Sequence, residues 1–357
     1  MTIRRALVAW FARGHRDLPW RRTRDAYAVW VSEIMLQQTR VETVTPYFER
    51  WMRRFPTVEA LAEAPLDDVL AEWAGLGYYA RARNLQTAAR EVTAAHGGRF
   101  PSTAAQLQTL RGVGAYTAGA VASIAFGEAA PIVDGNVVRV LARVDALAGA
   151  ADDAALKHEV WRRAGELVRA DGGESAGDFN QAMMELGATV CTPRLPDCAG
   201  CPLSAHCRAR AADAVEQHPG AKRKKRPRAV DAVTVLAERD GKLLLVRRPP
   251  TGLWGGLWEP PMGELARGAG DASHARAQAA AARMAKRCTG LELIDIQPLD
   301  RFEHVLTHRR MRFFAFRARA RGRVRLDGYD AARWQSRADA GALGIAAWTR
   351  RLLQKEM

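Results

Sequence analysis

The sequence is poor in cysteine and has no long apolar run. Only five cysteines occur in 357 residues, and four of them, Cys191, Cys198, Cys201 and Cys207, lie in one short segment. So few thiols exclude a fold built on many disulfides. No stretch approaches the roughly 18 to 20 apolar residues that cross a bilayer, and no apolar segment with a small-residue cleavage site opens the chain. We therefore expect a soluble, intracellular (cytoplasmic) protein without membrane contact.

Acidic residues are also scarce. Lys and Arg number 54 against 39 Asp and Glu, which gives a formal net charge of +15. Such an excess attracts polyanions and favours nucleic acid as a partner. The length exceeds that of a usual single domain, so two domains are expected, each large enough to bury its own core.

The four clustered cysteines follow the spacing C-x6-C-x2-C-x5-C. In a reducing compartment such a cluster indicates a metal site. Four thiolates without histidine suit a tetrahedral zinc ion or a cubane iron–sulfur cluster. Compact zinc sites usually pair two C-x2-C knuckles, and here only Cys198 and Cys201 form one. The spacing therefore favours iron–sulfur over zinc.

The periodicity of apolar residues changes along the chain. Up to residue 211 they recur every three or four positions, as in Tyr27, Trp30, Val31 and Ile34, which predicts an all-helical domain over 1–211. Like charges and prolines between Lys222 and Arg228 resist packing, and this run marks a basic linker over 212–229.

The remainder, 230–357, shows a period of two. Residues 233–238 and 242–247 flank an Arg-Asp-Gly turn and predict a hairpin, and residues 310–317 predict another strand. The alanine-rich residues 272–287 predict a helix between them. The second domain is therefore expected to be α/β or α+β.

Two glycines precede a predicted helix in the segment from Gly112 to Gly119. Backbone N–H groups and the helix dipole at such a start can hold a phosphate oxygen. A side chain there would keep a phosphodiester away from the backbone. Gly112, Gly114 and Thr117 are the candidate phosphate-binding residues.

Two carboxylates carry alternative interpretations. Asp134 precedes a helix and can cap it. Glu33 lies in the apolar helix around Trp30 to Gln38, so it occupies either a solvated face or a desolvated site with a raised pKa, suited to donating a proton.

Several motifs occur together and in order, and with them the chain resembles the MutY-type adenine DNA glycosylases of the endonuclease III superfamily. They are Leu18-Pro19-Trp20-Arg21, the helix from Trp30 to Thr39, Gly75 to Tyr79, the hairpin at Gly112, Asp134-Gly135-Asn136 and the four cysteines. The resemblance implies a multidomain protein: an all-α helix-hairpin-helix glycosylase domain with an iron–sulfur cluster loop, then an α/β Nudix-like domain. It also implies that the cysteines hold a 4Fe-4S cluster.

That family removes adenine paired with 8-oxoguanine or guanine after extruding the nucleotide, and leaves an abasic site. By resemblance Glu33 is the general acid, and Asp134 stabilises the oxocarbenium-like sugar. Bifunctional relatives carry lysine at the position of Tyr116. A phenol cannot form a Schiff base, so the resemblance implies a monofunctional enzyme. Asn136 matches a sugar-pocket residue.

The resemblance further implies substrate-binding residues and a partner. Trp20 and Arg21 match the first motif, Gln38 and Tyr78 match residues that wedge into the duplex, and Gln181 matches an adenine-edge contact. The expected partner is double-stranded DNA containing an A:8-oxoguanine or A:G mispair, bound by a monomer.

The second domain resembles a Nudix fold with a changed role. A Nudix hydrolase needs a glutamate-rich helix to hold magnesium, and residues 265–290 contain no glutamate. Nucleotide hydrolysis is therefore not expected. Leu306, Thr307 and His308 fall where the family carries a Phe-Ser-His triplet that reads 8-oxoguanine, so Thr307 and His308 are the candidate readers.

Two alternatives come from other classes. One is a metal-containing DNA-binding protein without catalysis, which would require Glu33 or Asp134 to be misplaced. The other is a Nudix-type diphosphatase with a helical attachment, which the missing glutamates disfavour.

Overall fold

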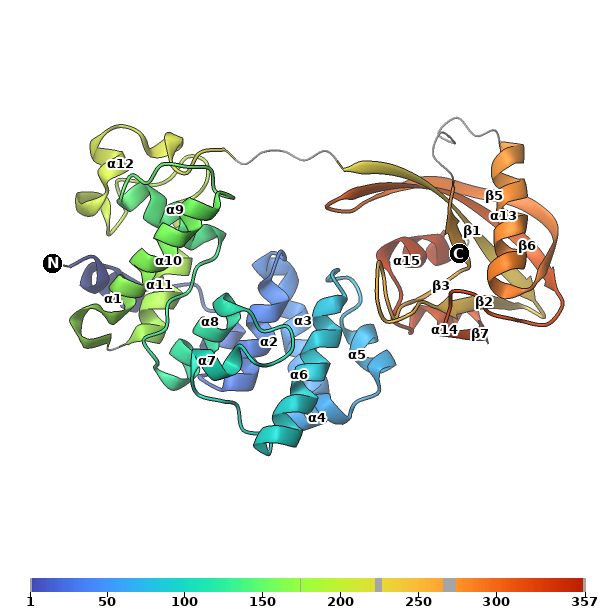
Figure 1. The fold of residues 1–357 in the computed structure, drawn as a ribbon, viewed down its shortest axis with the longest axis horizontal. Coiled ribbons are helices and arrows are strands. Elements are labelled where there is room, and N and C mark those ends of the chain that lie inside the picture. Colours follow the sequence, from blue (N-terminus) through green and yellow to red (C-terminus); the bar gives the residue numbers. More distant parts are fainter. Residues whose placement is uncertain (1, 174, 222–226, 266–273, 356–357) are drawn as a thin grey trace. The chain divides into compact units, whose positions relative to one another are not determined.

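The computed structural model describes residues 2–173, 175–221, 227–265 and 274–355. They divide into two compact units (Figure 1). The first comprises Met1–Glu63 with Asn84–Arg223, and the second comprises Ala64–Arg83 with Lys224–Met357. Residues 64–83 belong to the second unit, although the sequence-based boundaries place them in the first domain, and the predicted linker over 212–229 is divided between the two units. Residues 222–226 of the predicted linker lie outside the described residues.

The first unit is helical, as the period of three to four residues predicts, and its described residues contain no strand. Its elements are α1 (Ile3–Arg13), η1 (Pro19–Arg21), α2 (Ala26–Leu36), α3 (Val41–Arg54), α4 (Val58–Glu63), most of α6 (Ala80–His96), α7 (Ala104–Leu107), α8 (Ala115–Phe126), α9 (Gly135–Val144), α10 (Ala154–Arg169), η2 (Ala170–Gly173), α11 (Ala176–Thr189), η3 (Ser204–His206), α12 (Arg208–Ala211) and η4 (Val215–Gln217).

Helices α2 and α8 form the centre of this unit and pack on each other. Helix α2 starts where Asp25 accepts a hydrogen bond from the Ala28 N–H at 2.8 Å, and residues 27–35 are all buried. Helix α8 is likewise buried from Thr117 to Ile124 and ends at Gly127, whose φ of 74° is the left-handed cap that favours glycine. Helices buried on every side leave their polar side chains no solvated face.

Helix α11 packs closely on α8. A Cβ at Gly177 would lie 2.7 Å from the carbonyl oxygen of Ser123, so the contact requires glycine. The buried Asn180 amide donates to Ser123 Oγ at 2.8 Å and to the Ala130 carbonyl at 2.9 Å. These contacts fix the face of α11 that carries Gln181.

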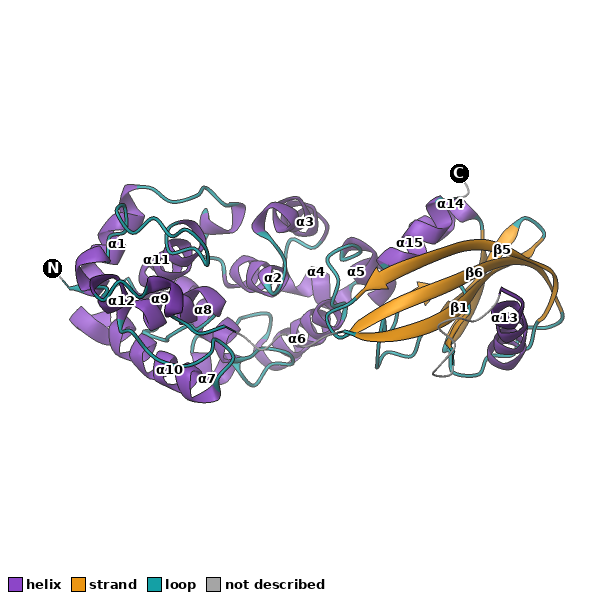
Figure 2. Ribbon diagram, turned by 90° about the horizontal axis from the view of Figure 1, so that it is seen from above, coloured by secondary structure: helices purple, strands orange, loops and turns teal. Residues whose placement is uncertain are grey.

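The second unit contains a seven-stranded mixed sheet (Figure 2). The strand order is β3-β2-β1-β6-β5, with β4 paired to β1 and β7 to β2. Among the strand pairs of the described residues, β1 and β6 are parallel and the others are antiparallel. The elements are α5 (Leu66–Glu72), β1 (Arg228–Arg239), β2 (Lys242–Arg247), β3 (Trp258–Glu259), β4 (Met262–Glu264), α13 (His274–Thr289), β5 (Glu292–Val305), β6 (Arg309–Arg321), β7 (Ala331–Gln335), α14 (Arg337–Gly341) and α15 (Ala347–Gln354).

The predicted hairpin and third strand of this domain are confirmed, and so is the predicted helix from residue 274 onward; residues 272 and 273 lie outside the described residues. Strands β1 and β2 pair across the turn at Asp240 and Gly241, both with positive φ, as a tight hairpin requires. Alternate residues of the strands face opposite sides. Helix α13 covers one side, where Phe314 and Phe316 lie in its core cluster. On the other side Phe313 stacks on Trp348 of α15, with ring centroids 4.6 Å apart.

Residues 64–83 are anchored to the second unit by specific hydrogen bonds. The Tyr79 hydroxyl donates to the Ile345 carbonyl at 2.9 Å, and Arg83 donates to the Gly255 carbonyl. Trp258 Nε1 donates to Asp67 at 3.4 Å. Across the described residues, no helix combines the length and apolarity that a membrane crossing needs.

Candidate active site and cysteine loop

The first unit contains a pocket of about 540 Å³ that collects most of the candidate catalytic residues. Helices α2, α8 and α11, the residues after α2 and the start of α9 form its walls. Its lining comprises Arg16, Leu18, Trp20, Arg21, Val29, Ser32, Glu33, Leu36, Gln37, Gln38, Thr39, Val41, Tyr116, Ile124, Asp134, Gly135, Asn136, Gln181, Met184 and Ala188. Among the sequence-predicted residues, Trp20, Arg21, Glu33, Gln38, Tyr116, Asp134, Asn136 and Gln181 thus meet here.

Glu33 is desolvated rather than placed on a solvated face. Its side chain lies in the centre of α2 and is only 3% exposed. Burial raises the pKa of Glu33 to about 7, whereas a hydrogen bond from the Tyr116 hydroxyl at 2.5 Å opposes this rise. The nearby Asp134 charge raises that pKa further, and Arg21 lowers it. Glu33 can therefore hold a proton near neutral pH and release it.

Asp134 occupies a different environment at the start of α9. One carboxylate oxygen accepts the Val137 N–H at 2.8 Å, which caps the helix, and the other accepts the Asn136 amide at 3.0 Å. Burial raises the pKa of Asp134 above its usual value, but these hydrogen bonds and the charge of Arg139 hold it back. Hydrogen bonds that favour the charged form keep a carboxylate ionised.

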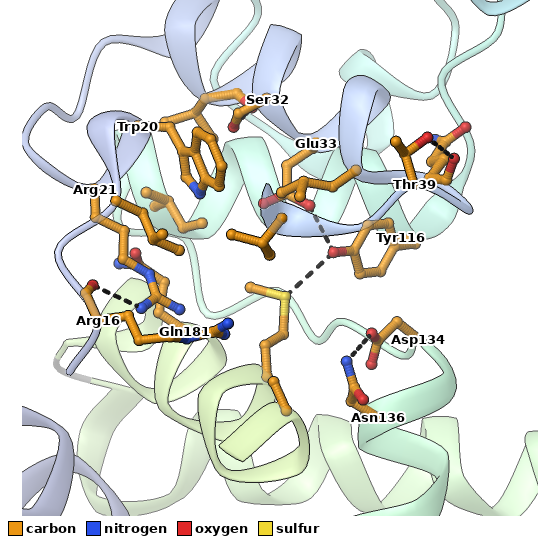
Figure 3. A pocket seen from close by; sticks show the side chains of 18 of the residues that line it. Arg16, Trp20, Arg21, Ser32, Glu33, Thr39, Tyr116, Asp134, Asn136 and Gln181 are labelled. Atoms are coloured by element: carbon orange, nitrogen blue, oxygen red, sulfur yellow. Dashed lines mark hydrogen bonds between the residues drawn. The ribbon is translucent and has the colours of Figure 1, made fainter. Parts of the chain in front are cut away.

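The two carboxylates reach the pocket from different helices (Figure 3). Glu33 and Tyr116 meet on one side, and Asp134 with Asn136 lies on another, while Gln181 comes from the facing helix. The Tyr116 hydroxyl also contacts the sulfur of Met184 at 3.2 Å. The arrangement can supply a proton at one point and a negative charge at another.

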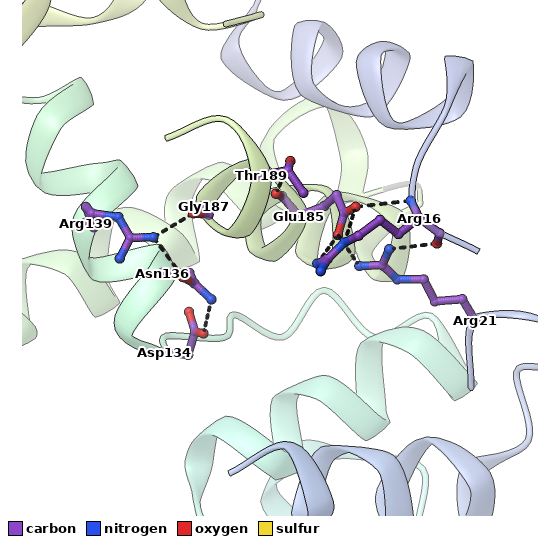
Figure 4. A network of polar contacts seen from close by, with 8 residues as sticks. All are labelled: Arg16, Arg21, Asp134, Asn136, Arg139, Glu185, Gly187 and Thr189. Atoms are coloured by element: carbon purple, nitrogen blue, oxygen red, sulfur yellow. Dashed lines mark hydrogen bonds and ion pairs between the residues drawn. The ribbon is translucent and has the colours of Figure 1, made fainter. Parts of the chain in front are cut away.

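The sequence interpretation missed Arg16, Glu185 and Arg139. Glu185 on α11 accepts hydrogen bonds from both Arg16 and Arg21, while Arg139 donates to Asn136 at 2.8 Å and to the Gly187 carbonyl at 2.6 Å (Figure 4). A signal existed for Glu185, because it follows Gln181 by four residues and thus shares its helix face.

Gln38 and Tyr78, the predicted wedge residues, share an unusual backbone. Both are exposed and both have positive φ, 58° for Gln38 and 47° for Tyr78. Non-glycine residues rarely adopt this conformation, and such strain is concentrated at functional sites. Gln38 lines the pocket of the first unit, whereas Tyr78 belongs to the second unit.

The predicted reader residues occupy the turn between β5 and β6 of the second unit. Thr307 and His308 are both exposed there. The hydroxyls of Tyr78 and Thr307 share a hydrogen bond. Two candidate residues that are 229 positions apart in the sequence are therefore neighbours.

The glycine hairpin before α8 meets the expectation in part. Gly112 has a φ of 75°, and a Cβ there would lie 2.7 Å from that of Asn84, so internal packing already requires glycine. Gly114 caps α8 and faces open space. The Thr117 side chain is 1% exposed and accepts a hydrogen bond from Gln37. Any phosphate contact at Thr117 must come from its backbone N–H.

All four clustered cysteines line one small cavity between α9, the end of α11 and the loop to α12. They are free thiols. Burial raises the pKa of the Cys201 thiol to about 11, and the other three cysteines contribute to this rise. Within the described residues, no three His, Cys, Asp or Glu side chains are grouped to hold a single metal ion. Four thiols without a histidine could hold either a zinc ion or an iron–sulfur cluster.

Comparisons with known proteins agree with this geometry. Residues 31–166 match the HhH-GPD superfamily of base excision DNA repair proteins, and residues 232–355 match the NUDIX domain. A solved structure of a thermostable thymine-DNA glycosylase is 29% identical, with a TM-score of 0.52, and the match covers 58% of this chain and 95% of that chain.

Two curated relatives are adenine DNA glycosylases. The protein from Homo sapiens is 43% identical over 313 residues, which cover 72% of this chain and 57% of the relative. The protein from Mus musculus is 38% identical over 358 residues, which cover 86% of this chain and 68% of the relative. The chain thus spans between about half and two thirds of these relatives' length. With both domains matched in order, the chain belongs to the adenine DNA glycosylase family.

Proposed function

We propose that this chain excises adenine mispaired with 8-oxoguanine or guanine in duplex DNA, and leaves an abasic site. The observation that carries the proposal is the pair of carboxylates in one pocket. Burial raises the pKa of both, but two N–H groups and the charge of Arg139 favour the charged form of Asp134, whereas the pKa of Glu33 reaches about 7. Cleavage of an N-glycosidic bond places negative charge on the departing base and positive charge on the sugar, so it needs an acid and an anion.

Glu33 is the proposed acid. It protonates a ring nitrogen of adenine, so the bonding electron pair of the breaking C1′–N9 bond leaves with a neutral base. The sugar becomes an oxocarbenium-like cation. The Glu33 carboxylate then accepts a proton from the water that attacks C1′, which restores the acid. Its pKa of about 7 suits both steps near neutral pH.

Asp134 is the proposed electrostatic partner. It stays ionised and stabilises the positive charge on the sugar, while Asn136 holds its free oxygen in place. The +15 net charge of the chain and the backbone N–H groups at the start of α8 support binding of the DNA backbone. We propose that a monomer binds the duplex.

The proposed reaction stops at the abasic site. A lyase step needs an amine that attacks the sugar. The pocket lining contains Arg16, Arg21 and the phenol of Tyr116 but no lysine among the described residues. Tyr116 is also engaged with Glu33. These features support a monofunctional glycosylase.

The experiment that tests this function measures single-turnover excision on duplexes with A opposite 8-oxoguanine, G or T. Alkali-dependent scission at adenine in the two mispairs, and not in A:T, is the expected result. Little borohydride trapping should accompany it. Binding without scission would instead identify a non-catalytic DNA-binding protein, and cleavage of nucleoside triphosphates to a monophosphate and pyrophosphate would identify a diphosphatase.

We propose that Cys191, Cys198, Cys201 and Cys207 hold a 4Fe-4S cluster. The shared cavity supports this, as does Arg143, which donates to Cys191 Sγ at 3.3 Å and to the Thr192 carbonyl at 2.8 Å. A bound cluster would organise this loop, because four thiolate bonds replace contacts that a short loop lacks. No catalytic step requires it.

Purified protein should be yellow-brown and contain about four irons per chain. Cys198→Ser should lose most of the iron and the visible absorption, because it removes one ligand. Cys288→Ser is the matched control, since Cys288 lies buried in the second unit. Anaerobically purified protein that contains zinc and no iron would contradict the assignment.

We propose that the second unit reads 8-oxoguanine through Thr307 and His308, with Tyr78 beside them. The exposed turn and the hydrogen bond between Tyr78 and Thr307 support this. The double variant Thr307→Ala/His308→Ala should lower the preference for A:8-oxoguanine over A:G by roughly 1 to 3 kcal/mol, the loss of one or two hydrogen bonds. Single-turnover rates on both mispairs measure it.

The control for this double variant is Asp240→Asn in the exposed turn between β1 and β2. This turn lies at the end of β1 away from Thr307 and His308, so the variant should leave the preference for A:8-oxoguanine unchanged. An unaltered ratio in Thr307→Ala/His308→Ala would move lesion recognition away from this turn.

A further inference from the structure

Glu185 is a buried carboxylate that the proposed chemistry does not use. It lies on α11, and its side chain is 2% exposed. It accepts hydrogen bonds from the Arg16 backbone N–H at 3.1 Å, from Arg16 Nη2 at 2.7 Å and from Arg21 Nη2 at 2.9 Å. Burial by itself would raise the pKa of Glu185, but the hydrogen bonds from Arg16 and Arg21 hold it at about 2. The carboxylate is therefore ionised at any working pH.

Both arginines line the same pocket as Glu33. Arg21 is the more buried of the two, with a side chain 8% exposed against 36% for Arg16. Its guanidinium also donates to the Arg16 carbonyl at 3.2 Å and lies over the Phe11 ring at 5.4 Å. The carboxylate, the carbonyl and the ring thus fix where the Arg21 charge lies.

Arg21, which donates a hydrogen bond to Glu185, is one of the charges that act on Glu33. The titratable and charged groups that act on Glu33 are Tyr116 of α8, Asp134 before α9 and Arg21 of η1. From α11, Gln181 and Met184 line the pocket without charge. A proton on Glu33 is favoured by Asp134 and opposed by Arg21. A further positive charge on this wall would therefore drive the proton off.

We propose that Glu185 is a positioning residue for the acid: it holds Arg16 and Arg21 at the pocket wall and offsets their charge, so that Glu33 keeps its proton when adenine enters. The purpose of this arrangement rests on the proposed function, but the effect of the three charges on Glu33 is present in the protein without DNA. Two guanidinium charges and one carboxylate charge leave one net positive charge in the triad.

Two substitutions move this charge in opposite directions. Glu185→Gln keeps the shape and leaves two positive charges, so Glu33 should lose its proton at lower pH than in the wild type. Arg16→Gln leaves none, so Glu33 should lose its proton at higher pH. Arg16 is partly exposed, so this second variant tests the sign even if Glu185→Gln does not fold.

The first measurement titrates Glu33 in the full-length protein without DNA. Infrared difference spectra against Glu33→Gln isolate the carbonyl band of the protonated Glu33 carboxyl. The titration midpoint of Glu33 should be lowest in Glu185→Gln, intermediate in the wild type and highest in Arg16→Gln. Glu185→Asp keeps the charge and should keep the wild-type midpoint. Equal midpoints in all variants, or the reverse order, would overturn the inference.

The second measurement follows single-turnover excision between pH 6 and pH 8. The loss of rate in Glu185→Gln should be roughly twofold to fivefold larger at pH 8 than at pH 6, as expected for a downward shift of half to one pKa unit from about 7. If Glu185 had a merely structural role, Glu185→Gln would lower the excision rate by the same factor at pH 6 and at pH 8. Glu159→Gln, in a surface pair with Arg162, is the matched control. If the wild type excises no adenine, the proposed function fails, and the midpoints still decide the role of Glu185.

Discussion

Replacing Glu33 with glutamine should reduce adenine excision by about 10² to 10⁴-fold, the usual contribution of a positioned acid. The amide keeps the shape and can still accept the Tyr116 hydrogen bond, but it has no proton to give to adenine. Binding of the mispair should change little. Single-turnover excision and a separate binding titration measure the two properties.

The pH dependence of the excision rate of the wild type should follow the titration of Glu33. Because a protonated Glu33 is needed, the rate should fall as pH rises through the pKa of about 7. The residual excision rate of Glu33→Gln should not fall with rising pH, whereas Glu159→Gln should have the pH–rate profile of the wild type. A Glu33→Gln enzyme with near-normal rates would remove Glu33 from the acid role.

Glu33→Gln should lower the excision rate but raise the free energy of unfolding above neutral pH. The folded-state pKa of Glu33, about 7, lies above its usual value of 4.5, so the folded protein binds this proton more tightly than the unfolded chain. The resulting stabilisation is complete below pH 4.5 and is lost as pH rises towards 7. At pH 8 Glu33→Gln should therefore be more stable than the wild type, by up to about 3 kcal/mol. Denaturant unfolding at pH 4.5 and pH 8 tests this sign.

Asp134→Asn should have the second large effect, a loss of about 10² to 10³-fold in excision rate, the range for removing one group that stabilises transition-state charge. The amide carries no negative charge to offer the sugar cation. It also meets the Asn136 amide, which now donates to the Asp134 carboxylate at 3.0 Å. Single-turnover excision on the A:8-oxoguanine duplex measures the loss.

Asp134 also caps α9, so the variant needs a control for stability. Replacement of an N-cap aspartate with alanine costs about 1 kcal/mol, whereas asparagine caps a helix about as well as aspartate. Asp153→Asn is the matched control, because Asp153 caps α10 by accepting the Ala155 N–H at 2.8 Å and does not line the pocket. Similar thermal midpoints in the two variants with a rate loss only in Asp134→Asn would assign the effect to charge. Equal excision rates in Asp134→Asn and Asp153→Asn would refute the electrostatic role of Asp134.

The sequence by itself determined the features that local interactions control. A period of three to four residues predicts helices, and a period of two with an Asp-Gly turn predicts the β1–β2 hairpin, because these patterns depend on neighbours in the chain. The cysteine spacing and the glycines before α8 are likewise local. The family motifs, being contiguous strings, identified most of the residues that line the pocket.

Only the tertiary structure decided the environment of those residues. The sequence left Glu33 between a solvated face and a buried site, and packing around α2 buries it. The same packing buries the Thr117 side chain, which accepts a hydrogen bond from Gln37. Residues 64–83 join the second unit, and Tyr78 meets Thr307 there. Glu185 and Arg16, 169 positions apart, form an ion pair that no local pattern indicates. Burial and charge pairing depend on contacts between distant segments, so they follow from the fold rather than from sequence spacing.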